Sequence, residues 1–422
     1  MLGLLPPAVT SLVLAWFLSS GRWSLVGIWV EPSVIGWPTS FADVANVTAT
    51  ADCLAAGEPI EGCDPYGRPF QPYVVLPARA LNLLNLGLAE TGYIGVALGV
   101  LWIVLVGAIA VWMVARWERS TGELLAALGA ITIAAIAPPS LLAVERGTLD
   151  ILVVSLAAAG LLVIAGSQGR AGVLFGSLAL SVAVVLKYFA IGVFAAFLAP
   201  RRWRAMPLIA AGLCAIFLVV NFSNLIQARE TAKADLPSTT RILFSSTTGM
   251  VTLLTEDPVA FFPAEGQVID MVTLRIVGAV IFTAWVVVFL MLLRGIDSPP
   301  YASWLLITGG GFLLLVPYFL GDSNDYRLIG LLLPLAGIVR WRTCGPTRLW
   351  LPIILILLAM ITGSAMVTNE FGFLMPKPVI IAGDMALAGG LAFAVAVWLR
   401  GWFMRGRFTT PVDWSGSARQ KS

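Results

Sequence analysis

The stretch VERGTLDILVV, residues 144–154, places three charged side chains beside an apolar segment in a chain that is only 12% charged. We assign Glu145 and Asp150 to the start of the following helix, where the helix dipole favours carboxylates and Thr148 can serve as the N-cap. Arg146 is unfavourable at that end unless it has a partner or a ligand, and guanidinium groups bind phosphate. The turn is therefore a candidate functional site.

Two other segments also place polar side chains at the edges of apolar stretches. Lys187 interrupts VAVVLKYFAIGVF, and the segment YFLGDSNDYRLIGLLLP carries a second group. The further polar residues of these two segments are Tyr188, Asp322, Asp325, Tyr326 and Arg327. Lys187 alone is equally well explained by snorkelling of its ammonium to water. Three clusters on one side of a membrane nevertheless favour function, because ionisable residues at that depth are costly.

The first long polar segment supplies carboxylates for general-base chemistry. Asp43 follows the first apolar stretch, and residues 42–56 are compatible with a short amphipathic helix on the membrane surface. Asp64 lies in CDPYGRP, where turn formation is a stronger explanation than catalysis. A carboxylate can deprotonate a hydroxyl, while arginine and lysine bind phosphate. This combination fits transfer from a lipid-linked phosphate to a hydroxyl, and it also fits binding or moving such a lipid without a reaction.

The elements that position these residues are predicted to be membrane helices, because 59% of the chain is hydrophobic. About twelve apolar stretches predict an all-α polytopic membrane protein, and several exceed the roughly 18 residues that a bilayer crossing needs. The stretches are 3–20, 92–115, 122–141, 149–166, 171–187, 189–200, 205–223, 272–293, 302–320, 327–340, 349–367 and 379–400. The sixth is short, and Pro138 and Pro139 interrupt the third, so either can be a bent or partial crossing.

The distribution of lysine and arginine predicts the orientation of these helices. Short basic turns follow every second stretch and indicate the cytoplasmic side, although Arg22 argues weakly for the opposite arrangement. Both termini are then cytoplasmic, and the long polar segments 21–91 and 224–271 lie outside. Residues 1–407 form one transmembrane domain, followed by a polar cytoplasmic tail over 408–422. A bacterial inner membrane is the expected location.

Composition excludes several classes of function. The chain contains no histidine, which removes histidine bases and histidine-ligated metal sites. A net charge of +3 without a basic stripe gives no support for nucleic-acid binding. Cys53 and Cys63 share one polar segment, and their spacing leaves open whether they form a disulfide.

Four segments resemble bacterial GT-C membrane glycosyltransferases related to glycosyltransferase family 87. ERGTLDILVVSLAAAGLLVIAG resembles that family's ERGN-x-D turn and helix, and SLALSVAVVLKYFAIGVFAAFLAPRRWRA is similar to its Lys-aromatic junction and basic turn. FADVANVTATADCLAAG with the later DPYG resembles its first outer loop, and GDSNDYRLIGLLLPL resembles a late rim segment. The chain departs from the pattern at Thr148 and Leu149, which replace the family's Asn and its neighbour. This departure affects any sugar or acceptor contact at the turn.

The resemblance implies a GT-C-like bundle of about twelve helices with a long first extracytoplasmic loop. It implies a mannosyltransferase-like enzyme that moves a hexose or pentose from a polyprenyl-phosphate donor to a glycolipid or cell-envelope glycan, with inversion and without a metal or cofactor. Asp43 would be the base, and Asp64 a possible second carboxylate. Arg146, Lys187 and Arg327 would contact the donor phosphate. The cleft would be lined by Glu145, Asp150, Tyr188, Asp322, Asp325 and Tyr326.

Two alternatives remain open at this point. A transporter or flippase for a lipid-linked saccharide would use the same rim cations, but it would not need a carboxylate in the first loop and would often show repeated halves. No internal repeat is evident. A non-catalytic scaffold for envelope assembly would tolerate substitution of all the rim residues.

Overall fold

The computed structural model describes residues 2–20, 41–59, 63, 75–115, 117, 120–167, 169–198, 205–220, 271–320, 325–342, 347–362 and 377–403. Its α-helices are α1 (Leu5–Ser20), α3 (Ala42–Ala56), α4 (Val75–Leu83), α5 (Thr91–Val114), α6 (Thr121–Ile136), α7 (Pro138–Arg146), α8 (Asp150–Gly166), α9 (Arg170–Leu186), α10 (Ala205–Val220), α13 (Met271–Leu292), α14 (Tyr301–Leu320), α15 (Leu332–Arg342), α16 (Trp350–Thr362) and α17 (Lys377–Phe403). Short 3-10 helices are η1 (Leu2–Leu4), η4 (Leu88–Glu90), η5 (Tyr188–Leu198), η7 (Asp325–Leu331) and η8 (Thr347–Leu349). The described residues contain no strand, so the all-α prediction is confirmed.

Every predicted apolar stretch contains a helix, but the prediction of about twelve crossings is not confirmed. Within the described parts of the chain, three helices are long and apolar enough to cross a bilayer: Leu88–Val114, Tyr301–Phe319 and Ala382–Phe403. A fourth is counted if α6 and α7, which are bent by 45° at Ala137, form one span. The other apolar helices have 10–17 residues. The protein is an all-α membrane protein.

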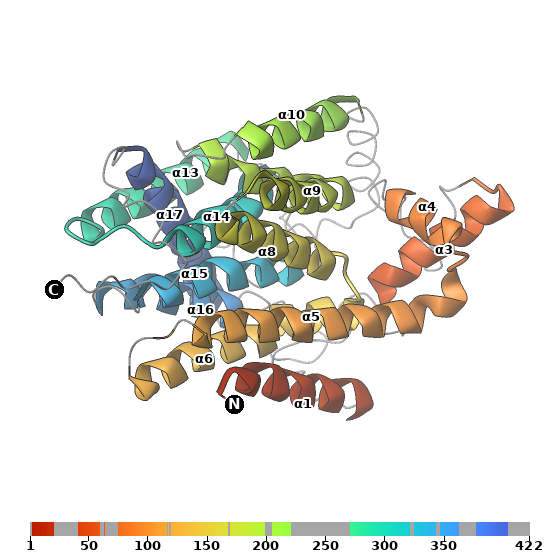
Figure 1. Cartoon of the computed structure of the whole chain (residues 1–422), viewed down its shortest axis with the longest axis horizontal. Coiled ribbons are helices and arrows are strands. Elements are labelled where there is room, and N and C mark those ends of the chain that lie inside the picture. The colour runs from red at the N-terminus through yellow and green to blue at the C-terminus, as the bar shows by residue number, and fades with distance from the viewer. Residues whose placement is uncertain are drawn as a thin grey trace.

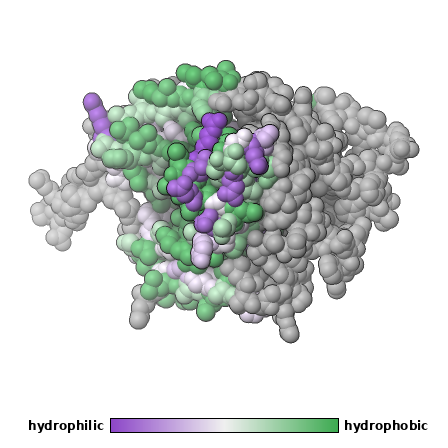
Figure 2. Space-filling model, turned by 90° about the vertical axis from the view of Figure 1, so that its right-hand side faces the viewer, coloured by the Kyte–Doolittle hydropathy of each residue, from purple (hydrophilic) through white to green (hydrophobic). Residues whose placement is uncertain are grey.

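The helices lie side by side in a bundle, and α3 and α4 lie beyond one end of it (Figure 1). Helix α5 starts beside α3 and α4 and runs to the opposite end of the bundle, where α6 begins. We call the end that carries α3 and α4 the α3 end. Hydrophilic side chains gather among apolar ones on this face (Figure 2). At the opposite end of the bundle, Arg342 at the end of α15 approaches Glu123 at the start of α6, with Nη2 and Oε1 3.8 Å apart. The Arg342 guanidinium also covers the ring of Trp350.

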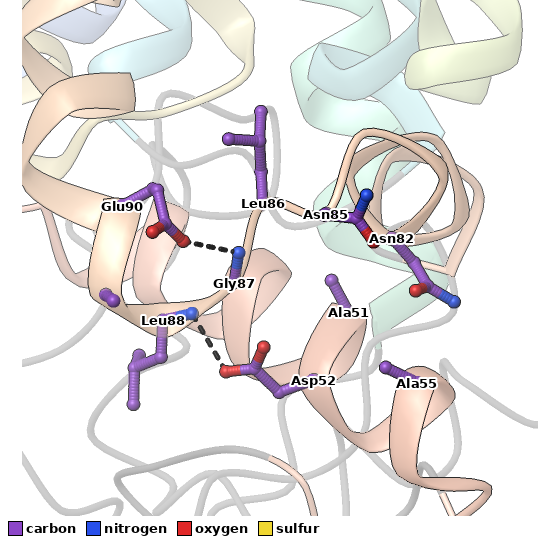
Figure 3. Close-up of a pocket in the computed structure, with 10 residues that line it drawn as sticks. Ala51, Asp52, Ala55, Asn82, Asn85, Leu86, Gly87, Leu88 and Glu90 are labelled. Carbon is purple, nitrogen blue, oxygen red and sulfur yellow. Dashed lines mark hydrogen bonds between the residues drawn. The ribbon is translucent and has the colours of Figure 1, made fainter.

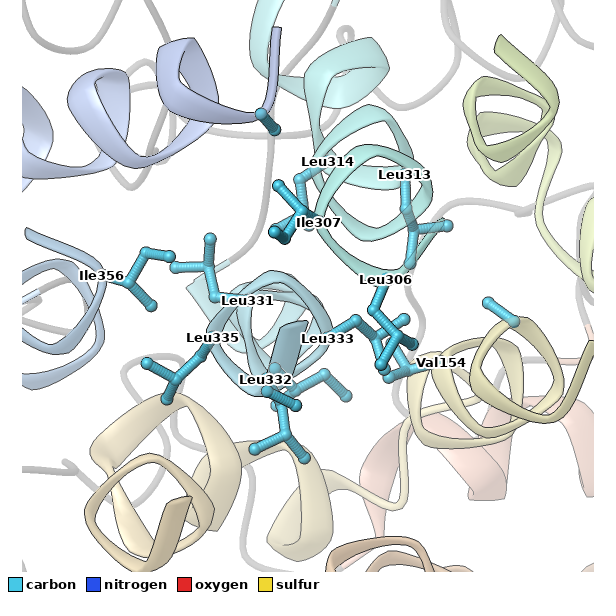
Figure 4. Packing of buried hydrophobic residues seen from close by; sticks show 14 of the residues in the cluster. Val154, Leu306, Ile307, Leu313, Leu314, Leu331, Leu332, Leu333, Leu335 and Ile356 are labelled. Carbon is cyan, nitrogen blue, oxygen red and sulfur yellow. The ribbon is translucent and has the colours of Figure 1, made fainter. Parts of the chain in front are cut away.

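Helix α14 lies at the centre of the hydrophobic core and packs against η5, α8, α15 and α17. Leucine and isoleucine side chains from α14, η7, α15 and α16 fill the space between these helices (Figure 4). The triplet Gly309–Gly311 permits this close approach. A Cβ at Gly309 would lie 2.8 Å from Leu161, and one at Gly310 would lie 2.6 Å from Leu333. Small residues at such crossings are typical of membrane helices.

One side of α5 explains why this long helix suits a bilayer. Aliphatic side chains are exposed along one side of α5 at intervals of one or two helical turns, whereas the other side of the helix is buried. The exposed residues are Val96, Val100, Val104 and Val111. On the buried side, Trp102 donates its indole N–H to the carbonyl of Ala135, 3.1 Å away, so its polar atom is satisfied. An exposed apolar stripe of this kind suits contact with lipid.

Candidate functional site

The charged turn is arranged differently from the sequence-based assignment. Glu145 and Arg146 lie in the last turn of α7, not at the start of α8. Pro138 and Pro139 begin this short helix, because proline at the first helical positions loses no hydrogen bond. Arg146 therefore complements the negative end of the α7 dipole, and Glu145 opposes it. The predicted dipole roles of these two residues are wrong, because the turn separates them from α8.

Gly147 ends α7 with a φ of 60°, and it brings α7 against α3. A Cβ at Gly147 would lie 2.8 Å from Val44 Cγ2 and 3.3 Å from the Cβ of Phe41. The backbone N–H of Phe41 donates to the carbonyl oxygen of Glu145 at 2.6 Å. The start of α3 is therefore fixed directly on the last turn of α7.

Phe41 is a supporting residue that the sequence analysis missed. It has a φ of 66°, which is unusual for a bulky side chain and costs roughly 1–2 kcal/mol. Its ring packs against Gly95 of α5, where a Cβ would overlap the ring. The contact with Gly95 and the hydrogen bond to Glu145 together hold this conformation. The signal in the sequence was only a phenylalanine before an acidic helix start, which is too common to identify.

Helix α3 places Asp43 in its first turn, where the dipole favours a carboxylate. Asp43 is partly buried, and it lies close enough to Glu145 for the two carboxylates to interact electrostatically. The predicted bounds of this helix are confirmed, but its predicted place on the membrane surface is wrong. Its middle is buried on all sides, and the Thr48 and Thr50 hydroxyls bond to backbone carbonyls within the helix. The helix therefore packs into the protein.

The buried carboxylate of Glu145 is only partly neutralised. Glu145 is 6% exposed, and its Oε2 has no hydrogen-bond partner among the described residues. Arg146 Nε lies 3.9 Å from that oxygen. A carboxylate removed from water without full pairing is costly, and such groups concentrate at functional sites. Asp43, Glu145 and Arg146 thus form one ionic cluster at the α3 end.

A second ionic group lies beside the first, at the start of α8. Lys187 Nζ is 2.7 Å from Asp150 Oδ2, and the two side chains are 4% and 1% exposed. Thr148 donates to the same oxygen at 2.8 Å and accepts from the backbone N–H of Asp150 at 3.3 Å. The snorkelling explanation for Lys187 is therefore wrong, because its ammonium is buried in an ion pair. The predicted N-cap role of Thr148 is wrong, because Leu149 is the N-cap of α8 and Thr148 lies one residue before it.

The remaining predicted residues divide into those near the cluster and those outside the described chain. The Arg327 guanidinium lies 5.0 Å from the centre of the Phe189 ring, and η7 packs against α7 and α8. Tyr188 is 46% exposed. Asp325 and Tyr326 belong to η7, but the structure does not describe their side chains. Asp64 and Asp322 lie wholly outside the described residues.

A further buried carboxylate was missed in the sequence. Asp384 is 7% exposed in α17, and it interacts electrostatically with Tyr318 of α14. The Tyr318 hydroxyl has no hydrogen-bond partner in the described parts of the chain. A lone aspartate in the apolar stretch 379–400 is a recognisable signal, because ionisable residues inside membrane helices are rare.

Cys53 and Cys63 form a disulfide, with their Cα atoms 6.1 Å apart. The bond ties the second half of α3 to the chain that follows it. Disulfides persist in oxidising compartments, so this bond favours an extracytoplasmic position for the α3 end. Within the described residues, no three Asp, Glu or Cys side chains are grouped as metal ligands.

No family model matches the chain, no curated protein is similar enough to count as a relative, and no solved structure matches the fold. The fold and the site together define an all-α membrane protein with two adjoining ionic clusters at one end of its bundle. Its chemistry has to be argued from these residues.

Proposed function

We propose that the protein is an integral-membrane glycosyltransferase. It moves a sugar from a polyprenyl-phosphate donor to a hydroxyl of a glycolipid or cell-envelope glycan. The observation that supports this proposal is the junction of α3 and α7. The backbone hydrogen bond from Phe41 to Glu145 fixes the start of α3, which carries Asp43, on the end of α7, which carries Arg146. A carboxylate and a guanidinium at one junction provide a base and a phosphate ligand.

The reaction is a single displacement. Asp43 accepts the proton of the acceptor hydroxyl, whose oxygen attacks the anomeric carbon of the donor sugar. The bond from that carbon to the phosphate oxygen breaks, and the lipid phosphate leaves as an anion. Arg146 and Arg327 stabilise this anion by charge-assisted hydrogen bonds, which are strong where water is excluded. Attack from the face opposite the leaving group inverts the anomeric centre.

Lys187 and Asp150 support the phosphate site from α9 and α8. Asp150 holds the ammonium of Lys187 in place at 2.7 Å, so the lysine is oriented before a donor arrives. Preorganised charge of this kind is more effective than a mobile side chain, since no reorganisation is needed during the reaction. Lys187 therefore contributes as a fixed cation at the start of α8.

The membrane setting fits a lipid-linked donor. The apolar stripe of α5 can face the acyl chains, and the polyprenyl tail stays in the bilayer while its phosphate reaches the α3 end. The α3 end faces the extracytoplasmic side, and both termini lie in the cytoplasm of a bacterial cell. The disulfide at the α3 end supports this orientation.

The test uses the purified protein in lipid nanodiscs with a panel of radiolabelled polyprenyl-phosphate sugars. Release of sugar to water or to a glycolipid acceptor is followed for the wild type, for Asp43→Asn and for Glu58→Gln. Glu58 is an exposed carboxylate just after α3 and serves as the matched control. We expect Asp43→Asn to abolish transfer with the fold intact, while Glu58→Gln transfers like the wild type. Transfer by Asp43→Asn would remove that residue as the base, and donor binding without turnover would favour a carrier of lipid-linked saccharide.

A further inference from the structure

A polar cavity of about 290 Å³ lies at the α3 end (Figure 3), and none of its lining residues belongs to the ionic clusters. The second half of α3, the turn after α4 and the short helix η4 form its walls. Its polar lining residues are Asp52, Asn82, Asn85 and Glu90. Ala51 and Leu86 provide apolar surface between them.

Each of the two carboxylates accepts one hydrogen bond from a backbone N–H. Asp52 Oδ2 accepts the N–H of Leu88 at 2.8 Å, and Glu90 Oε2 accepts the N–H of Gly87 at 2.7 Å. The Asp52 carboxylate packs so closely on Gly87 that a Cβ there would overlap it. Each carboxylate uses one oxygen in these bonds, and the second oxygen can accept a hydrogen bond from a ligand.

The two asparagines supply groups that can both donate and accept. Asn85 has a φ of 53°, a conformation that asparagine tolerates, so its presence is also explained by the turn. Asn82 supports that turn through its backbone carbonyl, which accepts the N–H of Asn85 at 2.9 Å. The turn does not require the side-chain amide of Asn82. This amide can therefore donate to a ligand and accept from one.

The lining selects a class of ligand. Among the described residues, the lining holds two carboxylates and no lysine or arginine, which disfavours phosphates and other anions. Carboxylate oxygens only accept, so the ligand must bring donors, and hydroxyl groups satisfy both carboxylates and amides. The volume of about 290 Å³ lies just below the usual range of small-molecule sites, roughly 300–1,000 Å³, so the ligand has to be a short saccharide. We infer that this cavity binds a neutral saccharide, the part of the glycan acceptor that lies away from the reacting hydroxyl.

The position of the cavity fits a distal acceptor site. Asp52 lies on the same helix as Asp43, about two and a half turns later, which is roughly 14 Å along the axis. The disulfide at Cys53 fixes the helix beside the cavity. The assignment of the saccharide as an acceptor rests on the proposed function, whereas saccharide binding itself does not.

The test measures saccharide binding by saturation-transfer NMR with the full chain in nanodiscs. The probes are methyl α-D-mannopyranoside, methyl α-D-glucopyranoside and their α-linked disaccharides. The variants are Asn82→Ala and Asp52→Asn, with Glu58→Gln as the control. Alanine favours the helix at position 82, and an asparagine oxygen at position 52 can still accept the Leu88 N–H, so both variants should fold. We expect each to weaken binding about tenfold, as loss of a ligand hydrogen bond does, and Glu58→Gln to bind like the wild type.

Absence of binding for every probe, or equal binding by Asn82→Ala and the wild type, would overturn the inference. A calorimetric titration with calcium alone provides a second criterion, because calcium binding lost in Asp52→Asn without saccharide binding would make the cavity a cation site. Asp43→Asn separates this inference from the proposed function. If Asp43→Asn and the wild type both bind saccharide but the wild type transfers no sugar, the saccharide site is supported and the glycosyltransferase is rejected. Transfer without binding at the cavity would reject the cavity alone.

Discussion

The ammonium of Lys187 lies 2.7 Å from Asp150 Oδ2, and neither side chain is more than 4% exposed. The pair joins the end of α9 to the start of α8, residues that are 37 positions apart in the chain. Thr148 adds a second donor to the same oxygen, while Asp150 Oδ1 has no partner among the described residues. The ion pair therefore fixes the end of α9 to the start of α8.

Breaking this pair on one side should be more damaging than removing it completely. Lys187→Met leaves a buried carboxylate unpaired, which costs about 3–5 kcal/mol, and the thermal midpoint in detergent should fall accordingly. The double variant Lys187→Met with Asp150→Leu should be less destabilised than Lys187→Met alone, because no uncompensated charge remains. Intrinsic tryptophan fluorescence follows the unfolding, since the chain has 15 tryptophans. Strictly additive effects of the two substitutions would show that the pair contributes no coupling.

Hydropathy was sufficient to locate the apolar helices of this fold, but not α3 and α4, which lie in the polar segment 21–91. Each of the twelve apolar stretches contains a helix, and Pro138 and Pro139 mark the bend between α6 and α7. These features depend on local composition, which a single sequence carries. The number of membrane crossings does not follow in the same way, because several of the helices are shorter than a bilayer requires.

The contacts of the site were less accessible from the sequence. The ion pair of Lys187 joins two helices and depends on their packing, so residue types alone suggested snorkelling instead. The assignment of Glu145 to α7 depends on the positive φ of Gly147, since this glycine ends one helix before the next begins. Phe41 holds α3 on α7 through a backbone bond that any residue type could make. The clustering of Asp43 with Arg146 was predicted only through the family resemblance.

Gly147→Ala should separate α3 from α7. An alanine Cβ would meet Val44 Cγ2 at 2.8 Å, and the residue would also have to keep a φ of 60°. We expect a loss of roughly 2 kcal/mol in stability and a larger loss of transfer activity, since Asp43 moves with α3. Thermal unfolding and the sugar-transfer assay measure the two effects. Gly129→Ala is the control, because nothing lies within 4 Å of a Cβ at that position of α6. Equal behaviour of the two variants would show that the α3–α7 contact is not required.

Reduction of the disulfide should loosen the second half of α3. The bond closes a loop of ten residues in sequence separation, and loop-closure entropy predicts a stabilisation of about 3 kcal/mol. Limited proteolysis of the protein in nanodiscs should cleave between Cys53 and Cys63 faster after reduction, and in Cys63→Ser without reductant. Saccharide binding at the cavity should weaken in parallel, because Asp52 is adjacent to Cys53. Cys214→Ser is the control, since Cys214 is a buried free thiol. Unchanged cleavage would show that α3 is held by its packing alone.

Substitutions of Arg146 separate two contributions to the proposed reaction: the positive charge of the side chain and the geometry of its guanidinium group. Its side chain is 13% exposed at the end of α7. Arg146→Ala removes a favourable dipole interaction worth about 0.3–1 kcal/mol, and it also removes the cation beside the buried Glu145, so the thermal midpoint should fall. Transfer rates are therefore compared at a temperature below the midpoints of both proteins. Transfer should fall by roughly 10²–10³-fold, the usual effect of losing one donor to a developing anion. Arg146→Lys keeps the charge but loses the bidentate fork, so we expect an intermediate rate. Initial rates at saturating donor, with Arg79→Ala as a control on α4 outside the cluster, measure these effects. If Arg146→Ala transfers sugar as fast as the wild type, the guanidinium does not stabilise the leaving phosphate, and that role would pass to Arg327.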